Sequence, residues 1–204
     1  MSKVKLTKGE LKRQRDSLGQ FERYLPTLQL KKQQLQITIF RMQKELAEKE
    51  AKLETQQDKI YEWAGLFADP FLPEDMDLRQ WLLPERVDIE TGNIAGAVIP
   101  VFVKAYFEKP DYDLYTTPLW VDKAVREISA FMSLLAEIEI IRHQIAIVRK
   151  ELRVTTQRVN LFEKVKIPEA KDNIRVIRIY LGDQQANAVG ISKAAKNRLE
   201  KRAF

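Results

Sequence analysis

The chain has 204 residues, of which 45% are hydrophobic and 31% are charged, and its formal net charge is +6. It contains no cysteine, which excludes disulfides, thiolate metal sites and cysteine nucleophiles. It has no run of about 18 apolar residues, so the sequence predicts no membrane-spanning helix, and its high charged content favours long helices with much exposed surface.

Residues 6–67 carry a heptad pattern, in which apolar side chains recur at alternating spacings of three and four residues. This pattern predicts a long coiled-coil helix, and the recurring positions form its seam, the stripe that contacts a partner helix. Thr7 and Glu10 have the spacing of a capping box at its start. One seam series is Leu11, Leu18, Leu25, Lys32, Ile39, Leu46, Leu53, Ile60 and Phe67, and the other is Phe21, Leu28, Leu35, Met42, Lys49, Gln56 and Trp63.

Four residues interrupt this seam or its helix. Pro26 lies inside the predicted helix, and because the heptad phase is the same on both sides, we expect a kink or a short break rather than a helix end. Lys32, Lys49 and Gln56 occupy seam positions. They are expected either to lie where the partner face is wet or to set the register of the pairing.

The middle of the chain, residues 69–122, holds six of the eight prolines and differs in composition. Residues 97–107 are rich in β-branched and aromatic side chains, and Thr91-Gly92-Asn93 has turn chemistry between two short apolar runs. The segment is therefore predicted to form a β-hairpin or small sheet, with Pro100 at an edge or a bulge. Residues 77–83 are expected to form a short helical turn.

The last segment, residues 123–204, repeats the heptad pattern. Its two series are Phe131, Ile138, Ile145, Leu152 and Val159, and Leu134, Ile141, Val148, Thr155 and Phe162. Beyond Pro168 the seam continues through Ile174 and Ile177 with its phase shifted by one residue, and we expect a bend at the proline to absorb this shift.

The two seams are of similar length and are expected to pair antiparallel within one chain. In that register Leu46 lies near Ile145 or Val148, and Leu18 lies near Val176. The predicted fold is mainly α, with a long antiparallel two-helix coiled coil and a small middle domain that contains a β-hairpin. The expected domains are an N-terminal coiled-coil helix at 1–68, the middle domain at 69–122, and a C-terminal coiled-coil helix with a basic tail at 123–204.

No common catalytic motif is present, neither a phosphate-binding glycine loop nor a serine nucleophile elbow. His143 is the only histidine, and it lacks the partner residues of a zinc site. The chain end is basic, through Lys193, Lys196, Arg198, Lys201 and Arg202. Such an end is either a soluble helix terminus or a surface for nucleic acid, lipid or an acidic protein cavity.

Four patches of the sequence resemble one family, the D subunits of V-type (vacuolar or archaeal-type) ATPases, which form the central rotor shaft, and the likeness is greatest to their divergent bacterial branch. The patches are "LTKGELKRQRDSL", "GNIAGAVIPVF", "QRVNLFEKVKIPEAKDNIRVI" and the basic end. The matching residues are Thr7, Lys8, Leu11 and Leu18; Asn93, Ala95, Gly96 and Pro100; Arg158, Val159, Asn160, Glu163, Ile167, Pro168, Asn173 and Ile174; and Lys193 and Lys196.

The resemblance implies a non-catalytic component that couples ATP hydrolysis or synthesis to rotation of a membrane rotor. Its helices would lie inside a ring of A and B subunits, and its middle domain would hold the F subunit and face the C (also called d) subunit. The chain would bind no cofactor, metal or nucleic acid itself, and it would be cytoplasmic and reach the membrane only through the complex. The alternatives are a stand-alone coiled-coil scaffold and a basic nucleic-acid-binding protein.

The same resemblance gives candidate interface residues. Those of the shaft are Thr7, Lys8, Leu11, Leu18, Arg158, Asn160, Glu163, Pro168, Lys193 and Lys196. Those of the middle domain are Asn93, Ala95, Gly96 and Pro100.

Overall fold

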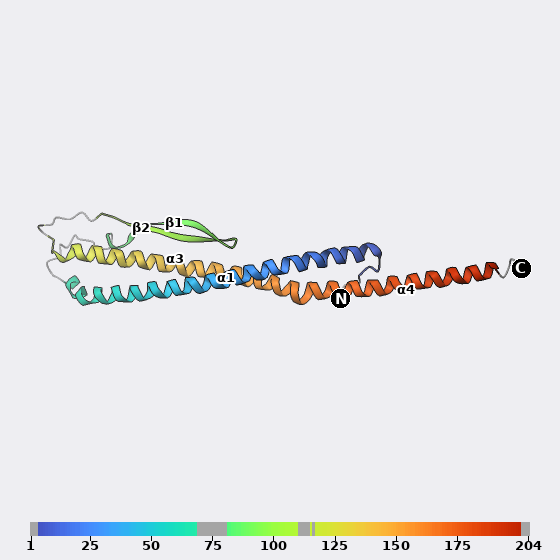
Figure 1. Ribbon diagram of the computed structural model, residues 1–204. Coiled ribbons are helices and arrows are strands. Elements are labelled where there is room, and N and C mark those ends of the chain that lie inside the picture. The colour runs from blue at the N-terminus through green and yellow to red at the C-terminus, as the bar shows by residue number, and fades with distance from the viewer. Residues whose placement is uncertain (1–3, 69–80, 110–114, 116, 201–204) are drawn as a thin grey trace. The chain divides into compact units, whose positions relative to one another are not determined.

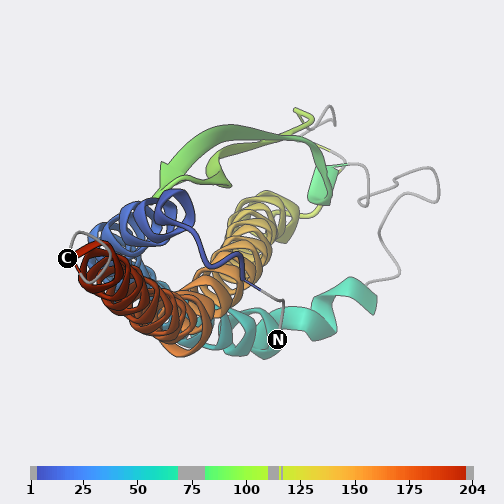
Figure 2. The ribbon, with the colours of Figure 1, turned by 90° about the vertical axis from the view of Figure 1, so that its right-hand side faces the viewer.

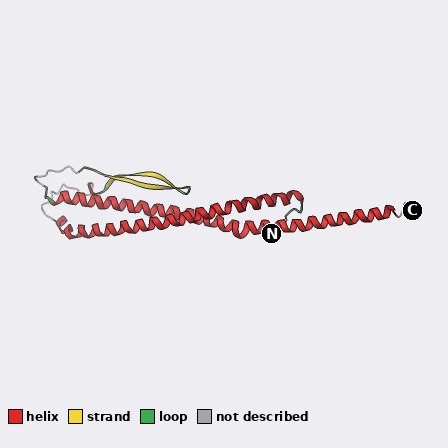
Figure 3. Ribbon diagram, viewed as in Figure 1, coloured by secondary structure: helices red, strands yellow, loops and turns green. Residues whose placement is uncertain are grey.

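The computed structural model describes residues 4–68, 81–109, 115 and 117–200. These residues are mostly helical, with one pair of antiparallel strands (Figure 3), which confirms the predicted fold class. The elements are α1 (Lys8–Trp63), the 3-10 helix η1 (Ala64–Ala68), β1 (Pro84–Ile94), β2 (Ala97–Phe107), α3 (Trp120–Leu161), the π-helical turn η2 (Phe162–Lys166) and α4 (Ile167–Glu200). Among the described helices, none combines the length and apolarity needed to cross a membrane.

The chain forms two compact units. The central unit is Gln33–Arg153, and the terminal unit combines Met1–Lys32 with Val154–Phe204. Helices α1 and α3 each contribute to both units. The predicted helical turn at 77–83 lies mostly outside the described residues.

In the central unit, α1 and α3 run antiparallel (Figure 1). Lys49 pairs with Glu137 at 2.8 Å, whereas Trp63, further along α1, donates from Nε1 to Glu127, earlier on α3, at 2.8 Å. The core of this unit is formed by seam residues and one strand residue, and Leu46 packs against it as predicted. Its buried members are Leu35, Ile39, Met42, Ile99, Ile141, Ile145 and Val148.

The strands of the central unit form a hairpin whose turn is Ala95-Gly96, not Thr91-Gly92-Asn93 as predicted. Ala95 and Gly96 both have positive φ angles, 51° and 86°, as a two-residue hairpin turn of type I′ requires. The Asn93 side chain supports the turn by accepting a 2.9 Å hydrogen bond from the Gly96 N–H. Both positions 92 and 96 carry glycine, so local turn chemistry did not distinguish them.

Packing explains the position of the turn. Ile94 and Ile99 contribute to the core, which fixes the inward face of the hairpin. Figures 1 and 2 place the hairpin on one side of α3 and the teal end of α1 on the other. Pro100 lies opposite Thr91, one residue beyond the Gly92–Ile99 pair and three beyond the Ile94–Ala97 pair that closes the turn. Hydrogen-bonded and non-hydrogen-bonded pairs alternate outward from that closing, hydrogen-bonded pair.

Pro100 therefore occupies a non-hydrogen-bonded pair, and its missing N–H removes no bond of the ladder. Its carbonyl also points away from β1 and accepts a hydrogen bond from the Gln144 side chain of α3. The prediction of an edge position holds, because both strands of a two-stranded sheet are edges. The irregularities of the register lie elsewhere, between Pro84 and Arg86 and between Asp88 and Ile89.

In the terminal unit, α1 packs against α3, η2 and α4. The Phe21 and Phe162 rings stack with centroids 5.3 Å apart, and Lys171 pairs with Glu22 at 3.2 Å. The buried residues of the C-terminal helices in this unit lie on the predicted seam. They are Thr155, Val159, Ala170, Ile174 and Ile177.

Thr7 caps the beginning of α1 as predicted, because the Glu10 N–H donates to Thr7 Oγ1 at 3.3 Å. The reciprocal half of the predicted capping box does not form, since the Thr7 N–H donates to the Lys5 carbonyl and Glu10 Oε1 accepts from Gln14. The helix continues through Pro26 and neither ends nor breaks there. A proline removes one backbone donor from a helix interior. Next to it, the Thr27 hydroxyl donates to the carbonyl of Tyr24 at 2.8 Å.

The one-residue shift of the seam has a different origin from the predicted proline bend. Residues Phe162–Lys166 form a π-helical turn, in which the Ile167 N–H donates to the Phe162 carbonyl, five residues earlier. A π turn contains one more residue than an α turn, and this extra residue accounts for the shift. Pro168 is the second residue of α4, directly after the wide turn.

Candidate partner-binding surfaces

The predicted shaft residues all belong to the terminal unit. Thr7 and Lys8 are exposed where α1 begins, and Leu11 and Leu18 are half-buried on its seam. On the C-terminal helices of this coiled coil, one group of predicted interface residues is exposed around η2 and another is exposed on distal α4. These residues are Arg158, Asn160, Glu163, Pro168, Lys193 and Lys196.

The residues around η2 present polar groups outward from a buried seam. Arg158 and Asn160 flank Val159, which is 3% exposed. Glu163 lies in the π turn itself and is exposed. Because the wide turn changes the direction in which successive side chains point, this stretch displays a surface that a regular helix of the same sequence would not.

The distal part of α4 is exposed along every face. All residues from 182 to 199 are exposed within the described chain, including the apolar Val189, Ile191 and Leu199. Lys193 and Lys196 therefore lie on a helix whose apolar side chains remain uncovered in the isolated chain. In proteins most helical stability comes from the packing of an apolar face, and the apolar side chains of this segment are exposed.

Three of the four predicted middle-domain residues lie at the tip of the hairpin in the central unit, and Pro100 lies further along β2, opposite Thr91. Asn93, Ala95 and Gly96 are exposed, and Pro100 is half-buried. A hollow of about 340 Å³ lies between the turn and α1. It is lined by Gln34, Ile37, Thr38, Arg41, Ile94 and Ala95.

The hairpin also carries a polar cluster on its exposed side. Arg86 contacts both carboxylate oxygens of Asp88, at 2.7 and 2.9 Å, and both Arg86 and Lys104 lie over the Tyr106 ring. The hydrogen bond from Arg86 lowers the pKa of the Asp88 carboxyl below that of a free aspartate, and the same bond raises the pKa of Arg86.

No group of histidine, cysteine, aspartate and glutamate residues that could hold a metal ion occurs among the described residues. His143 is exposed on α3. The described surface carries charged helix faces, an exposed helix and a hairpin tip.

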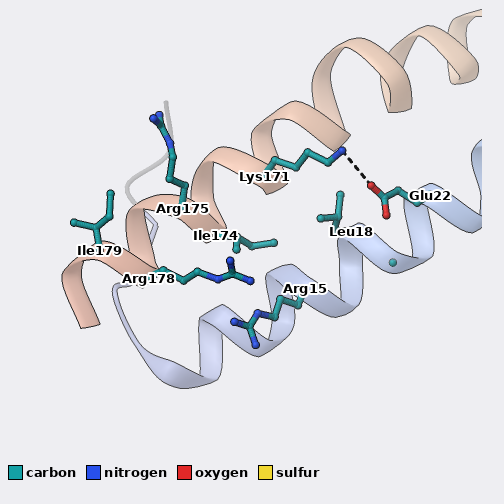
Figure 4. A pocket seen from close by; sticks show the side chains of 9 residues that line it. Arg15, Leu18, Glu22, Lys171, Ile174, Arg175, Arg178 and Ile179 are labelled. Carbon is teal, nitrogen blue, oxygen red and sulfur yellow. Dashed lines mark ion pairs between the residues drawn. The ribbon is translucent and has the colours of Figure 1, made fainter. Parts of the chain in front are cut away.

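Sequence reasoning missed one cluster, a groove in the terminal unit between α1 and α4 (Figure 4). Its basic residues come from two segments, one on α1 and one on α4, that lie more than 150 positions apart in the sequence. No local motif therefore contains the residues of both helices. The predicted pairing of Leu18 with Val176 would have brought them together, because Arg15 and Arg178 lie within one turn of those residues.

These features define a mainly α protein in which N- and C-terminal helices pair antiparallel within each unit, with a β-hairpin between them in the sequence. A family model that describes the D subunit of ATP synthase matches residues 10–197. The chain belongs to this family.

Three relatives match over nearly the whole chain. The V-type ATP synthase D subunit of Borreliella burgdorferi is 44% identical over 99% of this chain and 98% of its own length. The protein of the same name from Chlamydia abortus is 35% identical over 98% and 96%, and that from Chlamydia trachomatis serovar L2 is 31% identical over 98% and 97%.

Proposed function

We propose that this chain is the central-stalk component of a V-type ATPase, where it couples ATP hydrolysis or synthesis to ion-driven rotation. The single observation that carries the proposal is the family match over residues 10–197, together with relatives named as D subunits of V-type ATP synthases. A stand-alone scaffold or a nucleic-acid-binding protein is not favoured by these relatives.

The helix pairing suits a part that transmits torque. In each unit the apolar seam is covered by the antiparallel partner, through Leu35 and Val148 in the central unit and Ile177 in the terminal unit, all 0% exposed. The outer faces are largely charged. Exposed ion pairs contribute only about 0–1 kcal/mol each, so a charged shaft surface could move past a sleeve of other proteins without strong adhesion.

The two units suggest how partners divide along the chain. The terminal unit, with its exposed distal α4, would lie inside the ring of A and B subunits. The central unit, with its hairpin tip, would contact the F subunit and the C (or d) subunit. The uncovered side chains of Ile37 and Phe40, which are 48% and 71% exposed, support a protein partner on the central unit.

The chain would act without catalytic residues or a cofactor of its own. Nucleotide and magnesium would bind the ring, and ions would pass through the membrane sector. The protein would be cytoplasmic and peripheral, held at the membrane by the complex.

Affinity purification from the native cell tests this function. The chain is tagged, isolated gently and analysed with its companions by mass spectrometry and by an ATPase assay. Recovery with A, B and F subunits and ATPase activity is expected. Recovery of the chain alone, or with nucleic acid that salt removes, would refute the proposal.

A further inference from the structure

A groove of about 590 Å³ runs between α1 and α4 in the terminal unit. Leu18 and Ile174 point toward one another across it and form an apolar floor (Figure 4). Gly19 leaves space above α1, because a Cβ atom at this position would have no neighbour within 4 Å. Arg15 from α1 and Arg178 from α4 lie at one end, and we call the whole feature the basic groove.

The charges around the basic groove are incompletely neutralised. Lys171 pairs with Glu22 at 3.2 Å across the groove, and Arg175 pairs with Asp172 on its own helix at 3.4 Å and points away from the floor in Figure 4. Arg15 and Arg178 have no carboxylate partner among the described residues. Figure 4 shows Arg178 extending from α4 toward α1, where Arg15 lies.

Two unpaired guanidinium groups over one groove repel each other, and an anion placed between them would remove that cost. A guanidinium binds a carboxylate through two parallel hydrogen bonds, which makes arginine well suited to this task. The floor adds a second requirement, because the half-buried Leu18 leaves apolar surface uncovered beside the two arginines, above the buried Ile174.

We propose that the basic groove is a docking site for an acidic segment of a protein partner. An aspartate or glutamate of that segment binds Arg15 and Arg178, and a neighbouring apolar side chain covers the half-buried Leu18. The partner is a ring protein that surrounds the shaft, and this identification rests on the proposed function. Phosphate or a nucleotide fits less well, because the walls are helix sides whose backbone N–H groups are already bonded, and such ligands would leave the floor uncovered.

Binding of the chain to the reconstituted ring of A and B subunits tests the proposal. The double variant Arg15→Gln/Arg178→Gln is compared with wild type and with Arg23→Gln, a matched control on the same helix that is exposed and does not line the groove. We expect the double variant to bind about 10- to 100-fold more weakly and to lose much of the salt dependence seen for wild type. The control should bind as wild type does.

Four further results separate the possible failures. Thermal unfolding of the double variant should match wild type, since both arginines are exposed, so weaker binding cannot be ascribed to misfolding. If wild type itself does not bind the ring, the proposed function fails. If wild type binds and the double variant binds equally well, the docking site is refuted. The docking site is also refuted if millimolar inorganic phosphate binds the groove and leaves ring binding unchanged.

Discussion

The Lys49 ammonium lies 2.8 Å from the Glu137 carboxylate on the seam between α1 and α3. The side chains are only 20% and 28% exposed, so this pair replaces an apolar contact of the core with a charged one. Of the two roles that a polar seam residue could have, the structure supports register setting, because shifting either helix would leave a charge against apolar neighbours.

We expect removal of one partner of this pair to destabilise the chain. Lys49→Ala or Glu137→Ala leaves a half-buried charge unpaired, at a cost of about 1–3 kcal/mol. Replacing both residues by leucine should leave the free energy of unfolding unchanged or raise it. Urea denaturation of the wild type, the two alanine variants, their combination Lys49→Ala/Glu137→Ala and the leucine double variant measures these differences. Additive effects of the two alanine substitutions in their combination would show that the pair makes no specific contribution.

The extra residue in η2 makes a second prediction. Deleting Val165 should convert the π turn to an α turn and remove the phase shift with it, so Ile174 and Ile177 stay on the seam and the free energy of unfolding stays close to that of wild type. Deleting Asp172 from α4 instead leaves the π turn in place and rotates everything beyond it by about 100°, which moves Ile174 and Ile177 off the seam. We expect this second deletion to cost several kcal/mol, comparable to exposing two core side chains. Hydrogen exchange at residues 170–177 and thermal unfolding report the change.

Deletion of Ala186 is the matched control for that experiment. It also removes one residue from α4, but every described residue beyond it is exposed, so stability should hardly change. Equal losses for the Asp172 and Ala186 deletions would mean that helix length, not seam phase, determines stability. A loss of several kcal/mol on deletion of Val165 would contradict the assignment of the phase shift to η2.

The hairpin turn predicts opposite effects at its two residues. Ala95 has a left-handed conformation, φ 51°, which asparagine tolerates better than alanine. Ala95→Asn should therefore stabilise the chain by about 0.5–1 kcal/mol. Gly96→Ala should destabilise it by about 1–2 kcal/mol, because a Cβ atom is unfavourable at φ 86°. Urea denaturation distinguishes the two signs, and a destabilising Ala95→Asn would contradict the turn type.

The Arg86–Asp88 pair predicts a pH dependence. Folding lowers the pKa of Asp88, first through the hydrogen bond from Arg86, so the pair contributes stability above the pKa of an unfolded aspartate, about 3.9. This contribution is lost as the pH falls through the folded pKa. The difference in melting temperature between wild type and Asp88→Asn should be small but measurable at neutral pH, and it should shrink as the pH falls below about 3.9.

Carboxyl NMR titration provides an independent check of that pair. Arg86→Gln should return the pKa of Asp88 toward its ordinary range, whereas Arg142→Gln, which breaks the distant pair with Glu50, should leave it unchanged. A titration of Asp88 that is the same in all three proteins would contradict the assignment of the shift to Arg86.

The heptad pattern predicted most of the fold because burial in a coiled coil follows a strict period. It identified Leu35, Ile145 and Val148 as seam residues, and it revealed the phase shift near Pro168. It could not reveal that a π turn absorbs the shift, since proline bends and wide turns produce the same change of phase. The turn at Ala95-Gly96 was misplaced because the packing of Ile99 and Ile94, a tertiary effect, decided between two glycines.

Pro168 also determines where the wide turn can reside. In a helix without proline, such a π turn can move along the helix, as neighbouring residues exchange α-helical for π-helical hydrogen bonds. If the π turn moved in either direction, Pro168 would lie in the interior of a regular α-helix, where proline costs about 3 kcal/mol. The proline therefore keeps the π turn at one position in the sequence. A shaft built this way would keep its irregular surface at one fixed position along its axis throughout its rotation.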